Sequence, residues 1–170
     1  MDKIFLKGTY GYENFIDNEI KTTLLDWTHT NLTNFKENPI SPNRKYKKIN
    51  SGDSIYNLVV NLKTRIINQE NITDFIVEPY YEDYIGVNLI GGKIHRHKDD
   101  TQSGYIHTRW NLILSYPESG GHSIYNEEIN VLKENLIWRC DASEYFHSST
   151  EVIGDKPRIT LSLGFLIPKI

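Results

Sequence analysis

Apolar residues in the first third of the chain recur at the three- and four-residue spacing of an amphipathic helix. Over residues 13–32 the recurring positions are Ile16, Ile20, Leu24 and Trp27. A second run extends from Asp53, a candidate N-cap, through Ile55, Leu58, Val59, Leu62 and Ile66. Positions with this spacing share one face of a helix, so the pattern predicts two helices that lie on a sheet.

After residue 70 the pattern changes to short segments rich in β-branched and aromatic residues, separated by Gly, Pro, Asn, Asp and Ser. Such segments predict strands, here near residues 75–79, 84–90, 109–116, 122–125, 135–139, 151–153 and 158–167. This order favours an α+β protein, mainly β, with the two helices packed outside a β-sandwich or small barrel. Since 170 residues suffice for one core, residues 1–170 are expected to form a single domain. Residues 1–70 would be its helical N-terminal support and residues 71–170 its β-barrel core.

Composition narrows the classes of partner and compartment. Apolar residues make up 38% and charged residues 24% of the chain, which is typical of a folded globular protein. The net charge of −3 provides no global positive field, so neither a nucleic-acid nor a membrane partner is expected. Cys140 is the only cysteine, charge interrupts the first residues too early for a signal peptide, and no apolar run reaches membrane-spanning length. We therefore expect a cytoplasmic protein.

Residues 36–48 form a basic and turn-rich segment between the two predicted helices. The segment holds Pro39, Pro42, Arg44, Lys45, Lys47 and Lys48. It is interpreted as a solvated loop. The alternative is a positively charged lip over a substrate site, in which case an acidic or phosphorylated substrate is expected.

A dense polar cluster follows Gly91 and Gly92 and contains the strongest candidates for metal binding. His97 and Asp99 are two residues apart, so in an extended segment both side chains project to the same side. His147, in a later polar segment, is the best candidate for a third ligand. Two histidines and one carboxylate are typical of a facial Fe(II) site with three open positions. A surface loop that holds these residues by chance is the simpler alternative.

Arg158 begins a strongly apolar segment eleven residues after His147, and Thr160 would share its face of a strand. A guanidinium and a hydroxyl placed in this way could grip one carboxylate. The pattern of His97-x-Asp99, a distal His147 and then Arg158 resembles the 2-oxoglutarate/Fe(II)-dependent dioxygenase superfamily. The resemblance spans residues 84–168 and includes features of the prolyl hydroxylases and of the aspartyl/asparaginyl hydroxylases.

This resemblance implies a double-stranded β-helix, a jelly roll or cupin-like barrel, and a set of site residues. His97, Asp99 and His147 would bind Fe(II), while Arg158 and Thr160 would bind the distal carboxylate of 2-oxoglutarate. By the same resemblance, Asn88 and Arg109 would also contact the cosubstrate. No catalytic residue beyond the metal ligands is implied.

The reaction implied is hydroxylation of a C–H bond with 2-oxoglutarate and O₂, releasing succinate and CO₂. The substrate would be a protein side chain, an amino acid or another small metabolite. Asp99 disfavours a halogenase, since halogenases of this superfamily lack the carboxylate ligand. Gly164 stands where a nucleic-acid demethylase would carry a second arginine.

Two alternatives remain at this stage. His95 and His97 also resemble the alternating histidines of a cupin, which would be a metalloenzyme that does not use 2-oxoglutarate. The other alternative is a metal-free binding or structural barrel. His107, on the approach to a strand, is interpreted as a solvated loop histidine. The sequence does not indicate an oligomeric state.

Overall fold

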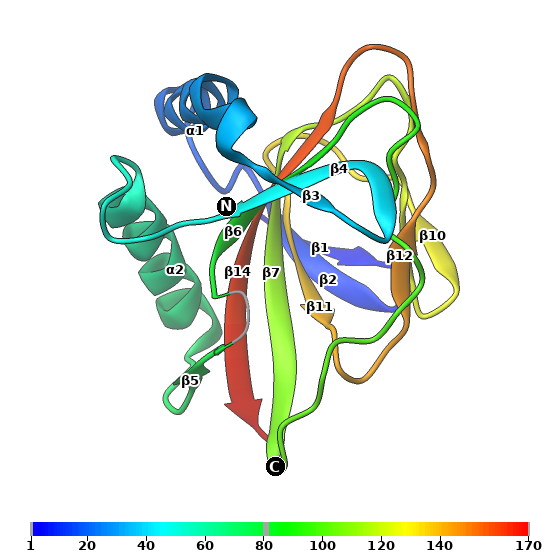
Figure 1. The fold of residues 1–170 in the computed structure, drawn as a ribbon. Helices are drawn as coiled ribbons and strands as arrows, with labels where there is room; N and C mark the ends of the chain where they lie inside the picture. The colour runs from blue at the N-terminus through cyan, green and yellow to red at the C-terminus, as the bar shows by residue number, and fades with distance from the viewer. Residues whose placement is uncertain (1, 80–81, 170) are drawn as a thin grey trace.

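The computed structural model describes residues 2–79 and 82–169, and these form one large β-sheet, an opposing layer of two smaller sheets, and two α-helices on the outside (Figure 1). Neighbouring strands of the major sheet follow the order β1-β2-β11-β7-β14-β6-β4-β3, and β5 pairs with β14. The bounds are β1 (Asp2–Leu6), β2 (Thr9–Glu13), β11 (Ile137–Asp141), β7 (Tyr105–Ser115), β14 (Arg158–Pro168), β6 (Tyr84–Asn88), β4 (Ser41–Lys48), β3 (Lys36–Asn38) and β5 (Ile76–Val77). All the pairings are antiparallel.

Shorter strands make the opposing layer. One group follows the order β10-β9-β12 and the other pairs β13 with β8. Their bounds are β8 (Ser119–Gly120), β9 (Ser123–Tyr125), β10 (Glu128–Asn130), β12 (His147–Ser149) and β13 (Val152–Ile153). The two layers face each other across the interior, where the polar site described below lies.

The helices α1 (Asn18–Asn31) and α2 (Tyr56–Glu70) lie where the helical spacing predicts them. Asp17 caps α1 by accepting a hydrogen bond from the backbone N–H of Ile20. The expected N-cap of the second helix is wrong, because Ile55 occupies the cap position of α2. The Asp53 carboxylate instead accepts the Asn50 N–H and pairs with Lys47 at 2.8 Å.

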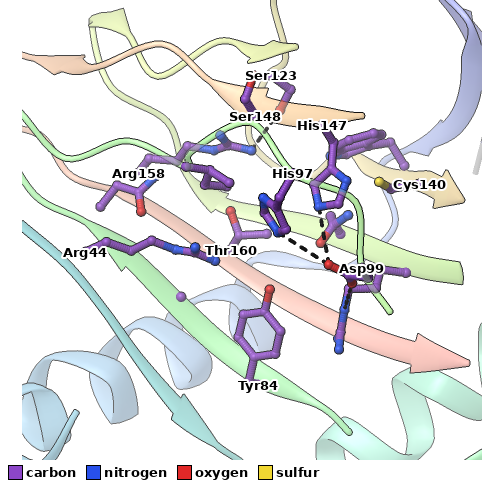
Figure 2. Close-up of a pocket in the computed structure, with 16 residues that line it drawn as sticks. Arg44, Tyr84, His97, Asp99, Ser123, Cys140, His147, Ser148, Arg158 and Thr160 are labelled. Carbon is purple, nitrogen blue, oxygen red and sulfur yellow. Dashed lines mark hydrogen bonds and ion pairs between the residues drawn. The ribbon is translucent and has the colours of Figure 1, made fainter. Parts of the chain in front are cut away.

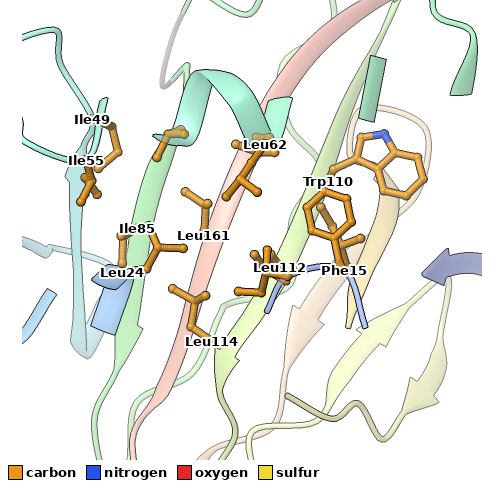
Figure 3. Packing of buried hydrophobic residues seen from close by; sticks show 14 of the residues in the cluster. Phe15, Leu24, Ile49, Ile55, Leu62, Ile85, Trp110, Leu112, Leu114 and Leu161 are labelled. Carbon is orange, nitrogen blue, oxygen red and sulfur yellow. The ribbon is translucent and has the colours of Figure 1, made fainter. Parts of the chain in front are cut away.

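Alternation along the central strands gives the major sheet one apolar face. Ile85, Leu161 and Leu112 lie directly opposite one another on β6, β14 and β7, and all three are fully buried. This face packs against Leu24 of α1 and Leu62 of α2 (Figure 3). Since side chains alternate between the two faces of a strand, the intervening residues of these strands point into the interior. The expectation of a mainly β protein with two helices outside the sheet is confirmed.

The sequence-based division at residue 70 needs a correction. The described residues 2–70 contain four strands, β1 to β4, besides the helices, and all four belong to the major sheet. Residues 36–48, interpreted as a loop, form the β3–β4 hairpin. The pattern missed β4 because few of its residues are apolar. Both faces of this strand are polar, so it lacks the apolar–polar alternation that predicts a strand. The strands β8, β10 and β12 were missed because two or three residues are too few to establish a period.

Among the described residues, neither helix is long and apolar enough to span a lipid bilayer. The longer of the two has 15 residues, whereas about 20 are needed to cross the hydrocarbon core.

Glu134 ties the start of α1 to the segment before β14 and makes stability depend on pH. Its two carboxylate oxygens contact Lys21 at 2.5 Å and Lys156 at 2.6 Å. Burial alone would raise the pKa of Glu134, but the hydrogen bonds from Lys156 and Lys21 lower it to about 2. A carboxyl with a lowered pKa stabilises the folded state above its unfolded pKa, and that contribution is lost as pH falls.

We therefore expect Glu134→Gln to lower the free energy of unfolding by about 1 kcal/mol at pH 7. The difference from wild type should shrink as pH falls from the ordinary glutamate pKa of 4.5 towards 2, as measured by denaturant unfolding at a series of pH values. Glu118→Gln, at an exposed glutamate, is the control and should have no such pH dependence. A loss for Glu134→Gln that is equal at pH 7 and pH 2.5 would contradict this account.

Candidate metal centre

The segment of residues 91–99 is docked along residues 142–152 by irregular backbone pairing. His97 and His147 exchange two backbone hydrogen bonds, His97 N to His147 O at 3.1 Å and His147 N to His97 O at 2.9 Å. The Asp99 N–H donates to Ala142 O at 2.9 Å. Directly opposed residues of an antiparallel bridge point to the same side, and the two imidazole rings accordingly lie 4.3 Å apart between centroids.

His97, Asp99 and His147 converge as the sequence predicts, with one potential ligand atom from each within 4.8 Å of the others. Asp99 Oδ1 is 3.3 Å from His97 Nε2 and 3.6 Å from His147 Nε2. Ligand atoms at about 2.1 Å from one ion and at right angles to each other are roughly 3 Å apart. The two separations therefore suit neighbouring positions around a single cation.

Hydrogen bonds to main-chain oxygens orient both imidazoles. His97 Nδ1 donates to His95 O at 2.6 Å, and His147 Nδ1 lies 3.4 Å from Tyr145 O. With the proton on Nδ1, the lone pair of Nε2 is free and points towards the other triad residues. This is the tautomer that can bind a metal through Nε2. The sequence spacing is the same in both cases, since each histidine contacts the carbonyl two residues before it.

The charge states of the triad also suit a cation. Burial alone would raise the pKa of Asp99, but the hydrogen bond with His97 and the charge of Arg109 hold it well below its usual range. Burial lowers the pKa of His147 to about 4, so this imidazole is neutral at pH 7. The hydrogen bond with Asp99 raises the pKa of His97, and a bound cation would compete with that proton.

A buried ionic network lies behind Asp99, the carboxylate of the candidate triad. Arg109 donates from Nε to Asp99 Oδ2 at 3.3 Å and from Nη2 to Glu78 Oε2 at 2.8 Å. Gly164 lies opposite Arg109 on β14, and a Cβ there would come within 3.2 Å of Arg109 Nη1. The network holds Asp99 Oδ2 and so fixes the orientation of the carboxylate, with Oδ1 facing His97 and His147.

His107 belongs to the same network, and its interpretation as a solvated loop histidine is wrong. Its side chain is buried on β7, with Nδ1 3.4 Å from Asp99 Oδ2. The two groups are not aligned for a hydrogen bond, and within the described part of the chain neither ring nitrogen has a hydrogen-bond partner. Burial lowers the pKa of His107, so it lies beside Asp99 as a neutral ring.

The triad opens onto a small cavity of about 70 Å³ between the two sheets, and Arg158 lies in the wall of this cavity (Figure 2). The guanidinium of Arg158 is buried and donates from Nη2 to Ser123 Oγ at 2.8 Å. Its Nε and Nη1 have no hydrogen-bond partner among the residues that the structure describes. Burial lowers the pKa of Arg158 to about 10, so the group stays charged at pH 7. A buried cation with two unsatisfied donors is costly unless an anion binds beside it.

The remaining predicted site residues line the same cavity. Asn88 lies directly opposite Arg158 in the β6–β14 pair, and Thr160 is two residues further along β14 on the same face. Arg109 also lines the cavity, and it donates hydrogen bonds to Asp99, Glu78, Glu82 and Ser162. Contact of Asn88 or Arg109 with a cosubstrate therefore stays a prediction.

Sequence reasoning did not assign Ser123, Arg44 and Tyr84 to this cavity. Ser123 orients Arg158 from the opposing sheet, whereas Arg44 and Tyr84 line the cavity from the major sheet. Arg44 was noted only as part of a basic segment, and its place follows from the pairing of β4 with β6. No local signal in the sequence specifies that pairing.

A wider groove of about 450 Å³ adjoins the triad on the outer side. It runs between the β3–β4 hairpin, which crosses in front of the major sheet in Figure 1, and the metal-binding segment. The lining includes Asn38, Ile40, Arg44, Tyr46, Tyr84, Arg96 and Lys98. Arg44, Tyr84, His97, Asp99 and Arg109 line both the groove and the inner cavity.

His95, which a cupin would use as a ligand, lies outside the cluster of metal-binding atoms among the described residues. Its side chain is exposed on the groove, and its carbonyl oxygen accepts the hydrogen bond from His97. This placement favours a triad of two histidines and one carboxylate over the cupin arrangement.

Comparison with solved structures shows that the fold is shared. A Pseudomonas putida prolyl-4-hydroxylase superposes with a TM-score of 0.69 at 13% identity, covering 96% of this chain and 94% of that one. HygX from Streptomyces hygroscopicus, with nickel, 2-oxoglutarate and hygromycin B bound, gives 0.68 at 9% identity, covering 96% and 84%. A Trichoplax adhaerens prolyl hydroxylase, in complex with a hypoxia inducible factor peptide fragment, gives 0.68 at 14% identity, covering 95% and 84%.

No protein-family model and no curated protein sequence matches the chain. At these low identities the superpositions establish the architecture, and the expected double-stranded β-helix is confirmed.

The network behind Asp99 leads to a prediction about metal affinity. Arg109→Met should weaken Fe(II) binding about 10- to 100-fold, since the carboxylate loses the donor that orients it. The same change should cost about 3–5 kcal/mol of stability, because it removes the cation beside the buried Glu78 carboxylate. Anaerobic Fe(II) titration and denaturant unfolding measure the two effects.

A second variant separates orientation from folding. Adding Glu78→Gln to Arg109→Met should restore much of the stability but not the metal affinity. If metal affinity returned together with stability, Arg109 would act on the metal centre only through folding.

Proposed function

We propose that the protein is a non-haem Fe(II) oxygenase that uses 2-oxoglutarate and O₂ to hydroxylate a C–H bond, releasing succinate and CO₂. The observation that carries this proposal is the presence of two complementary groups in one small cavity. His97, Asp99 and His147 offer an N₂O donor set on one side, and Arg158 offers a buried guanidinium with two unsatisfied donors on another. A 2-oxo acid with a second carboxylate fits both groups at once.

The donor set fits Fe(II) through its chemistry. Two neutral imidazoles and one carboxylate on one side of an octahedral ion leave three positions open. When bound, iron together with 2-oxoglutarate supplies the oxidising chemistry that a protein side chain cannot supply.

The chain itself binds, orients and excludes water. Arg158 would hold the distal carboxylate of 2-oxoglutarate through its unsatisfied Nε and Nη1 donors, and Thr160 would add a hydroxyl from the same face of β14. Ser123 fixes the guanidinium through its third nitrogen. The apolar cluster in the interior between the layers, which includes Trp138 and Cys140 of the cavity lining, would keep bulk water from that side of the cavity.

The substrate enters through the outer groove, which is several times larger than the inner cavity. Proteins of this fold include one with hygromycin B bound and one in complex with a peptide fragment. The substrate class is thus a protein side chain, an amino acid or another small metabolite.

The experiment is an anaerobic titration of metal-stripped protein with Fe(II) and then 2-oxoglutarate, followed by the weak visible charge-transfer band of the chelate. The wild-type protein should give the band. Arg158→Gln should weaken 2-oxoglutarate binding at least about 30-fold, since loss of one partner of a buried ion pair costs about 2 kcal/mol or more. His147→Ala should abolish the band.

His95→Ala is the matched control for His147→Ala. It removes an imidazole close to the triad but keeps the carbonyl that orients His97, so the band should persist. Loss of metal binding in His95→Ala, or metal binding without a band in wild type, would favour the cupin-like alternative. Absence of any metal binding would leave a metal-free barrel.

A further inference from the structure

Arg44 and Arg158 face the same cavity from two different strands. Arg44 lies directly opposite Asn88 on β6, and Asn88 lies directly opposite Arg158 on β14. Since directly opposed residues share a face and adjacent strands are about 4.8 Å apart, the two arginine Cα atoms are roughly 10 Å apart on one face of the sheet. Figure 2 shows both side chains extending into the cavity, with Thr160 between them.

Arg44 is partly buried, yet within residues 2–79 and 82–169 its side chain makes no ion pair or hydrogen bond. The neighbouring lysines of β4 differ from it. Lys45 pairs with Glu37 at 3.6 Å and Lys47 with Asp53 at 2.8 Å. The positive charge of Arg44 is therefore directed at the site and is not balanced within the hairpin.

The other cations of the outer groove are either paired with protein carboxylates or exposed to solvent. Arg96 pairs with Glu127 and stacks on Phe146, and Arg109 pairs with Glu78 and Asp99. Lys98 is exposed to solvent. Arg44 differs from Arg109 because no carboxylate of residues 2–79 and 82–169 pairs with it, and from Arg96 and Lys98 because it is partly buried and also lines the inner cavity.

One molecule of 2-oxoglutarate offsets only part of this charge. Its 2-oxo acid end belongs at the metal, and its distal carboxylate meets Arg158, which is buried deeper in the cavity. The guanidinium of Arg44 lies at the junction between the inner cavity and the outer groove, where the substrate enters. A second anion could pair with Arg44 there, and the substrate is a molecule that can bring it.

We propose that Arg44 is a specificity-determining residue that pairs with an anionic group, a carboxylate or a phosphate, carried by the primary substrate. This inference rests on the proposed function, since it names the substrate class of the same site. Tyr46 and Tyr84, whose rings lie 6.5 Å apart between centroids, flank the groove beside Arg44 and would contact the carbon skeleton that carries the anion.

The test uses four small probes that differ only in the side-chain anion. They are N-acetylated, C-amidated aspartate, asparagine, phosphoserine and serine, so that no terminal charge contributes. Each is titrated anaerobically into the protein loaded with Fe(II) and 2-oxoglutarate, and binding is followed by the shift of the chelate band and by calorimetry. The proteins are wild type, Arg44→Gln, Arg44→Lys and Lys45→Gln.

In wild type we expect at least one anionic probe to bind ten-fold or more tightly than its neutral counterpart. Arg44→Gln should remove this preference while changing the 2-oxoglutarate affinity less than two-fold. Arg44→Lys should retain part of the preference. Lys45→Gln removes the same charge from the next residue of β4, where Glu37 is its partner, and should behave as wild type.

A response to aspartate alone identifies a carboxylate, and a response to phosphoserine alone identifies a phosphate. The inference is overturned if neither anionic probe is preferred in wild type, or if Arg44→Gln keeps the preference. It is also overturned if Arg44→Gln weakens 2-oxoglutarate binding as strongly as Arg158→Gln, which would assign Arg44 to the cosubstrate. Failure of the proposed function is recognised separately, because the chelate band would then be absent before any probe is added.

Discussion

The two backbone hydrogen bonds between His97 and His147 are the contact on which the metal centre depends. They join segments fifty residues apart in the sequence and set the two imidazoles side by side. Each ring is then oriented by a carbonyl two residues earlier in its own segment. The triad is thus a product of strand pairing, and a shift of register by one residue would turn one histidine away from the other.

Alternation along β14 connects this centre to the core. Arg158 and Thr160 face the cavity, whereas Ile159 and Leu161 face the helices. The same strand therefore packs against the apolar faces of the helices on one side and places the buried guanidinium of Arg158 on the other. The cation is tolerated because Ser123 satisfies one nitrogen, and the two others are directed at the place where an anion would bind.

Sequence reasoning succeeded where a local pattern was sufficient. The spacing of His97 and Asp99 and the face shared by Arg158 and Thr160 are local, and the cavity contains all four residues. It failed for β4, whose polar residues lack the apolar alternation of a strand. It also failed for His107, whose burial follows from long-range packing of β7. The roles of Arg44 and Ser123 in the cavity follow only from the pairing of β4 with β6 and from the contact of Ser123 with Arg158 across the interior.

The position of β14 in the major sheet has a consequence for the order of folding. This strand is the last described in the chain, yet it lies between β6 and β7, which precede it by more than forty residues. During synthesis β6 and β7 are made before β14, the strand that pairs with both. Contacts between segments so far apart in the sequence are slow to form. The nascent chain thus exposes the unpaired edges of β6 and β7 until β14 has been made, and the core and the anion site are completed by the same event.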